Sequence, residues 1–190
     1  AAVQPLTISG TGAMSAPLLL DITNMMFDVR AGAQVSFPSV TAYAWNICAS
    51  SQLFFVDGSG STLSFPNLQT FNLGATSCGA SPRIRVSNGG SLDFSGLGSI
   101  TTESVNSLGI ELIAGGTVHL NSLLSAMKTT FTVDNTSTLD MPSLTSLANC
   151  TLNVAPGGFL TATSLTTVSS MNFSIASVGG AVALDGLQSI

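Results

Sequence analysis

Charge is scarce in this chain. Of its 190 residues only 7% are charged, with 4 lysines and arginines against 9 aspartates and glutamates, so the net charge is −5. Four basic residues cannot form a stripe that neutralises phosphates, and we therefore expect no nucleic-acid partner. A weakly charged exterior of serine, threonine, asparagine and glycine is typical of secreted or cell-surface proteins.

Long apolar runs are also missing, although 45% of the residues are hydrophobic. No segment approaches the ~18 uninterrupted apolar residues of a membrane-spanning helix, so we expect no membrane insertion. No long stretch follows a 3.6-residue period either, which argues against helical and Rossmann-type folds.

Histidine occurs once and cysteine three times. Without clustered histidines the usual zinc sites are excluded, and we expect neither a metal nor another cofactor. No signal peptide is recognisable, and a start at Ala1 and Ala2 is compatible with a processed mature chain.

What the sequence does contain is a repeat. In the copy that starts at Phe131, apolar residues stand at offsets 0, +2, +8, +10, +13 and +16, and the next copy starts 21 residues later. Such self-similarity is the signature of a repeat architecture. Eight copies start at Leu6, Phe27, Phe54, Ile84, Ile110, Phe131, Leu152 and Phe173.

Each copy predicts two short strands and a third, irregular side. Alternation over three residues sends the outer two inward, and paired glycines such as Gly89 and Gly90 suit a tight corner between the strands. Proline follows the second strand at Pro17, Pro38, Pro66 and Pro142, where the chain has left the ladder.

These features predict an all-β fold with a single domain over residues 1–190. We expect a parallel, right-handed β-solenoid of eight triangular coils with about 21 residues each. The inward phenylalanines Phe37, Phe65 and Phe94 should stack in coils two to four.

Three insertions interrupt the period. The step to the next copy lengthens to 11 residues after Tyr43, to 13 after Phe71 and to 10 after Ile100. The segments 44–53, 72–83 and 101–109 should therefore form longer loops at one corner of coils 2 to 4, and such insertions often mark a binding face. They predict a patch containing Trp45, Arg83 and Glu103, unless these loops simply pack over one another.

Cys48 and Cys78 lie in the first two insertions. Because these loops are neighbours in the stack, we expect a disulfide. Cys150 has no partner at a matching position and is expected to be a free, partly covered thiol.

Other surface chemistry is sparse. Three glycosylation sequons begin at Asn135, Asn149 and Asn172, and all three should be exposed. Arg85 and Glu111 should pair on adjacent coils. The outward residues Asp93, His119 and Asp140 fall on successive coils, where they could bind a metal or act as an acid/base set, but a surface ladder is the simpler interpretation.

Neither end of the chain shows a polar cap, although solenoids need their terminal coils covered. We expect either flanking solenoid repeats or head-to-tail copies of the chain as partners. The interface between copies would contain Leu6, Ile8, Phe173, Ile175 and Ile190.

The segments FPNLQTF, starting at Phe65, and MPSLTSL, starting at Met141, carry a Pro-x-Leu-x-x-Leu or closely similar line. This line resembles receptor L-domain-like and leucine-rich β-helix repeats. The resemblance implies a surface or extracellular setting and no particular activity.

The leading hypothesis is a non-enzymatic extracellular structural protein, a rigid module of a fibre. An alternative is an adhesin or receptor-like binding module that uses the insertion patch, with glycans as a candidate partner. A carbohydrate-active enzyme using Asp93, His119 and Asp140 is less favoured, since the surface has few acidic pairs and few basic contacts.

Overall fold

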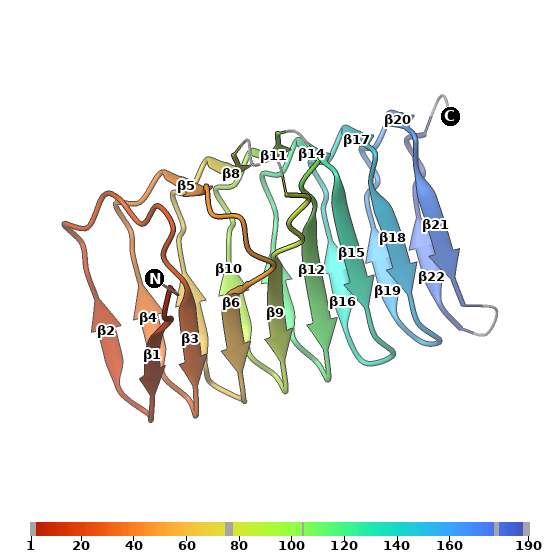
Figure 1. The fold of residues 1–190 in the computed structure, drawn as a ribbon. Coiled ribbons are helices and arrows are strands. Elements are labelled where there is room, and N and C mark those ends of the chain that lie inside the picture. Colours follow the sequence, from red (N-terminus) through yellow and green to blue (C-terminus); the bar gives the residue numbers. More distant parts are fainter. Residues whose placement is uncertain (1–2, 75–77, 104, 177–178, 188–190) are drawn as a thin grey trace.

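β-Strands are the only regular elements in the part of the chain that the computed structural model describes, residues 3–74, 78–103, 105–176 and 179–187 (Figure 1). The strands form four sheets, and the hydrogen-bonded neighbours within them are parallel. An all-β chain with parallel sheets is consistent with the expected β-solenoid.

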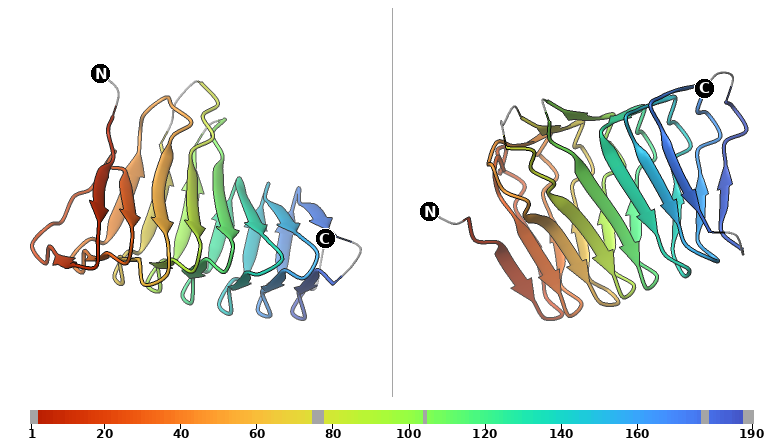
Figure 2. Two further views of the ribbon diagram at one scale, coloured as in Figure 1. Left: turned by 90° about the horizontal axis from the view of Figure 1, so that it is seen from below. Right: turned by 45° about the vertical axis from the view of Figure 1, so that its right-hand side comes forward.

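The largest sheet has eight strands in chain order, which Figure 2 shows from two further directions. Its register places the first apolar residue of each repeat beside that of the next, so that Leu6 pairs with Phe27 and Leu152 with Phe173. Its strands are β1 (Leu6–Ser9), β3 (Phe27–Arg30), β6 (Gln52–Asp57), β9 (Arg83–Ser87), β12 (Leu108–Ile113), β15 (Thr129–Val133), β18 (Thr151–Val154) and β21 (Asn172–Ile175).

The second strands of the repeats form two separate sheets. A five-stranded sheet contains β2 (Ala13–Ser15), β4 (Gln34–Ser36), β7 (Thr62–Ser64), β10 (Ser91–Asp93) and β13 (Thr117–His119). A three-stranded sheet contains β16 (Thr138–Asp140), β19 (Phe159–Thr161) and β22 (Ala181–Ala183). The interruption between β13 and β16 has no counterpart in the first sheet, where β12 pairs with β15.

The third side of the repeats is more regular than expected, because it also forms a sheet. This sheet has six strands, and it begins only in the second repeat. In the first repeat the corresponding segment carries the exposed side chains of Leu18 and Leu20. The six strands are β5 (Ala42–Trp45), β8 (Thr70–Leu73), β11 (Ser99–Thr102), β14 (Ser125–Met127), β17 (Ser146–Ala148) and β20 (Thr167–Ser169).

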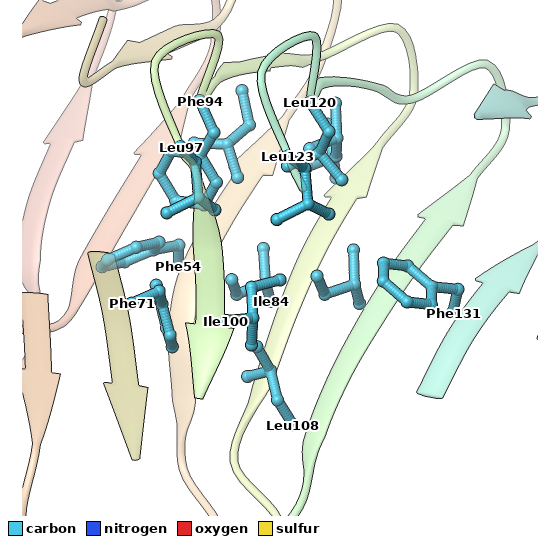
Figure 3. Packing of buried hydrophobic residues seen from close by; sticks show 14 of the residues in the cluster. Phe54, Phe71, Ile84, Phe94, Leu97, Ile100, Leu108, Leu120, Leu123 and Phe131 are labelled. Carbon is cyan, nitrogen blue, oxygen red and sulfur yellow. The ribbon is translucent and has the colours of Figure 1, made fainter. Parts of the chain in front are cut away.

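The inward side chains of the three sides pack into one apolar core, part of which is seen in Figure 3. Phe54 lies among five aromatic rings whose centroids are 4.9 to 6.0 Å from its own. Phe37 and Phe65 stack with centroids 5.2 Å apart, and Phe94 lies 5.9 Å from Phe65. The predicted contact between these three phenylalanines is therefore confirmed.

The corner between the first and second strands changes type along the chain. In the second, fourth and fifth repeats two consecutive residues have positive φ, as in Asn88-Gly89 and Ala114-Gly115, and this is the pattern of a type I′ turn. In the sixth repeat neither Asn135 nor Thr136 has a positive φ, and the backbone N of Ser137 donates to the carbonyl of Asp134 at 3.4 Å. The turn thus changes hand at the repeat where the second-side sheet is interrupted.

Candidate functional site

Trp45 is a core residue, so the expectation that it contributes to an exposed binding patch is wrong. It is 1% exposed, and its Nε1 donates to the carbonyl of Ala49 at 3.3 Å. In β5 the inward-outward alternation continues for one more step beyond Tyr43, which turns the indole inward beside Leu73 of β8. That alternation was visible in the sequence.

The insertions form a layer held together by its own contacts. The side chain of Asn106 is buried, its Oδ1 accepts from the backbone N of Ala80 at 3.1 Å, and its Nδ2 donates to the carbonyl of Gly74 at 2.8 Å. The predicted disulfide joins Cys48 to Cys78, whose Cα atoms are 5.9 Å apart. The loops therefore pack over one another, which was the simpler of the two expectations.

Arg83 belongs to a charged cluster on the first sheet. Its Nη1 lies 3.8 Å from Oε1 of Glu111, and Nη2 of Arg85 lies 2.7 Å from Oε2 of the same carboxylate, so the expected pair of Arg85 and Glu111 is present. Glu103 is exposed, and its backbone N donates to the carbonyl of Leu73 at 2.8 Å. Partly exposed ion pairs of this kind add little stability.

Cys150 is a free thiol, as expected, but it is fully buried instead of partly covered. Its Sγ lies 3.4 Å from the carbonyl oxygens of Ala126 and Ala148. Burial raises the pKa of the thiol, and a buried protonated thiol is unreactive. Cys150 is therefore part of the core and not a nucleophile.

The three sequon asparagines Asn135, Asn149 and Asn172 are all exposed, which confirms the expectation about their position. Asn149 has a positive φ of 54°, a conformation that asparagine tolerates better than most residues. Glycosylation at these sites stays a prediction.

The acid and imidazole column is only partly continuous. Asp93 and His119 are in register on β10 and β13, whereas Asp140 stands on β16, across the interruption. Burial tends to raise the pKa of Asp93, but hydrogen bonds from Ser95 and Ser64 outweigh it and hold that pKa below its usual value. The Asp93 carboxylate thus accepts hydrogen bonds from Ser64 and Ser95 in a surface network.

A polar groove of about 430 Å³ opens between β13 and β16. The inward residues of these two strands, Val118 and Leu139, remain buried. The strands therefore separate on the outer surface only, and the apolar core is not exposed to solvent there. This hollow between the two strands is called the β13–β16 groove below. Its polar lining residues include His119, Asn121, Thr136, Ser137, Thr138 and Asp140.

Apolar side chains are exposed on the outermost strands of the first sheet. Leu6 of β1 is 40% exposed, and Phe173 and Ile175 of β21 are 37% and 45% exposed. Ile8 is half-buried, and Ile190 lies outside the described residues. Four of the five residues expected at an end-to-end interface are thus available at the edges of the sheet.

No group of three or more His, Cys, Asp or Glu side chains among the described residues is placed to hold a metal ion. The described chain also contains no helix with the length and apolar character needed to cross a membrane. Comparisons with protein-family models, with curated proteins and with solved structures find no match. The resemblance to L-domain-like repeats therefore stays a prediction.

Proposed function

We propose that this chain is a non-enzymatic extracellular structural protein, a single-domain, right-handed β-solenoid of eight coils that stacks end to end into a fibre. The observation that supports this proposal best is the exposure of Leu6, Phe173 and Ile175 on strands β1 and β21, which are the outer strands of a parallel sheet. Native proteins normally protect the edge strands of a sheet, and a second copy of the chain would cover these two.

The joint between two copies follows from the register of the first sheet. Each strand repeats the column of the previous one, so β1 of one copy can follow β21 of another with Leu6 beside Phe173 and Ile8 beside Ile175. In the second-side sheets, β2 can likewise follow β22, which places Met14 beside Val182. Two sheets would then continue through the joint.

The energy of the joint comes from apolar burial and from strand pairing. Because the apolar side chains at the ends are already partly covered, each contributes less than half of the about 1.5–3 kcal/mol that full burial gives. Parallel pairing also satisfies backbone groups on four edge strands. Many small terms must act together, so we expect association to depend on concentration.

The extracellular setting rests on three observations. The disulfide between Cys48 and Cys78 is exposed and would be reduced in a cytosol. The asparagines of the three sequons are exposed, and the surface is rich in uncharged hydroxyl groups. None of these features requires catalysis.

Sedimentation velocity over a range of concentrations tests the proposal. The unmodified chain should form larger species as concentration rises, whereas Ile8→Asp, which places a charge at the joint, should remain monomeric. Ser9→Asp, on the outward face of the same strand, is the matched control and should still associate. A chain that stays monomeric at every concentration would refute end-to-end assembly.

A further inference from the structure

The β13–β16 groove has the size of a small-molecule site and a mainly polar lining. Its volume of about 430 Å³ lies within the range of about 300–1,000 Å³ typical of small-molecule sites. The first sheet is not interrupted at these repeats, since β12 pairs with β15. The groove thus lies where two successive strands, β13 and β16, are not paired.

The lining favours a neutral ligand with many hydroxyl groups. His119 supplies an imidazole whose Nε2 lies 3.4 Å from Oγ of Ser91, Asn121 supplies an amide, Thr138 a hydroxyl and Asp140 carboxylate oxygens. The lining contains no lysine or arginine, and Asp140 would repel an anion. The Asp140 carboxylate is held in place by a hydrogen bond from the hydroxyl of Thr161.

Ser137 is a buried polar residue in the lining of the groove, with 3% of its surface exposed. Burial raises the pKa of the nearby Asp134 carboxyl, but hydrogen bonds that include one from the Ser137 side chain outweigh this effect and hold that pKa below its ordinary value. The same carboxylate accepts from the backbone N of Ala114 at 2.6 Å and of Thr136 at 3.0 Å. These contacts hold the corner that borders the groove.

An exposed aromatic ring stands beside the groove. Phe159 is 41% exposed on β19, in register with Thr138 of the groove wall. The other residues of this column are Ala13, Gln34, Thr62, Ser91, Thr117, Thr138 and Ala181, so the column holds its one aromatic ring next to the groove. Sugar rings combine an apolar C–H face, which packs on an aromatic ring, with hydroxyl edges that need donors and acceptors.

We propose that the β13–β16 groove binds a neutral saccharide, with one sugar ring on Phe159 and its neighbour's hydroxyl groups bonded by Asp140, His119 and Asn121. The proposal is independent of fibre formation, since the groove faces outward on the side of the stack. The sugar can be a free oligosaccharide or an N-glycan attached to Asn135, which precedes the lining residues Thr136 and Ser137.

Calorimetric titration with neutral hexasaccharides of glucose, mannose and N-acetylglucosamine tests this proposal. At least one should bind, and Phe159→Ala should weaken it by about tenfold or more, equivalent to ~1.4 kcal/mol. Asp140→Asn should also weaken binding and is small enough to leave the fold intact, which a thermal melt would verify. Phe55→Ala, an outward phenylalanine on β6, is the matched control and should bind normally.

Each of the remaining outcomes decides the question. Asn135→Gln should leave the affinity for free sugar unchanged, and stronger binding in this variant would identify the protein's own glycan as the usual occupant. Failure of all three sugars to bind the folded Asn135→Gln protein would overturn the proposal. Binding that survives both Phe159→Ala and Asp140→Asn, or a preference for acidic sugars or extended peptides, would overturn it as well.

Discussion

Repeats two to four and repeats six to eight follow the same pattern of inward residues but differ in what surrounds it. The earlier repeats hold a cluster of aromatic rings, carry the insertions and include type I′ corners. In the later repeats the core consists mainly of leucines such as Leu139, Leu152 and Leu160. The corner between the first and second strands contains Asp134 in the sixth repeat and Pro156 in the seventh. One strand pattern thus accommodates two kinds of core and two kinds of corner.

Burial fixes the residue type at the inward strand positions of each repeat, whereas the residues and the conformation of the corners can vary. The first sheet continues from β1 to β21 through both regions, because its inward columns are apolar throughout. The corners lie outside that constraint. The second-side sheet is interrupted where the turn changes after the fifth repeat, and the core stays closed there. Variation at corners is where a repeat protein can gain a site.

Removing the central ring should have the largest effect on stability. Phe54 is fully buried among five rings, whereas Phe131, also fully buried, lies in the aliphatic region. We expect Phe54→Ala to lower the free energy of unfolding by about 4–5 kcal/mol and Phe131→Ala by nearer 3 kcal/mol, since fewer ring contacts are lost. Urea denaturation measures both, and equal losses would remove the energetic distinction between the two regions.

Breaking the disulfide should come next. Cys48 and Cys78 are 30 residues apart, and closing a loop of this size stabilises the chain by about 3–4 kcal/mol on the chain-entropy model. The double variant Cys48→Ser, Cys78→Ser should lose this amount, and hydrogen exchange should rise mainly in the insertions. Uniform acceleration along the chain would show that the insertions are not a local unit.

Glycine substitutions at equivalent corners should have opposite effects. Ala114 has a φ of 51°, so Ala114→Gly should relieve strain and stabilise the protein by about 0.5 kcal/mol. Asn135 stands at the equivalent position of the sixth corner without a positive φ, and Asn135→Gly should cost about 0.5–1 kcal/mol. Thermal melts compare the two, and the same sign for both would contradict the change of turn type.

The smallest expected effect is a loss of stability in acid. Hydrogen bonds from the hydroxyl of Ser87 at 2.6 Å and the amide of Asn88 at 2.7 Å hold the pKa of Asp57 below its ordinary value of 3.8. A carboxyl with a lowered folded-state pKa stabilises the protein above its unfolded pKa, and this contribution is lost as the pH falls from about 4 through the folded value. Melting temperatures should therefore fall less steeply in acid for Asp57→Asn and for Ser87→Ala, and unchanged slopes would exclude this role.

The sequence predicts the strands well because burial imposes a strict period on them. The register of Leu6 with Phe27, the stacking of Phe37 on Phe65 and the neighbouring insertion loops all follow from that period. The burial of Trp45 was also predictable from the alternation that begins at Tyr43.

The corners were less predictable because several turn types span the same number of residues. Ala114 and Asn135 are equivalent corner positions, and Ala114 has a positive φ whereas Asn135 does not. The strand pattern is the same on both sides of the interruption next to His119, so the sequence predicted Asp140 in one continuous column with His119. The change from an Ala-Gly-Gly corner at 114–116 to an Asn-Thr-Ser corner at 135–137 was the signal available in the sequence.

Electron microscopy of the purified chain at high concentration tests end-to-end assembly most directly. Eight strand spacings of about 4.8 Å predict filaments with an axial repeat of about 38 Å, continuous along the first sheet. Ile8→Asp should leave single short rods, while Ser9→Asp should still form filaments. Single rods of the unmodified chain at every concentration, with β1 and β21 facing solvent, would contradict the account.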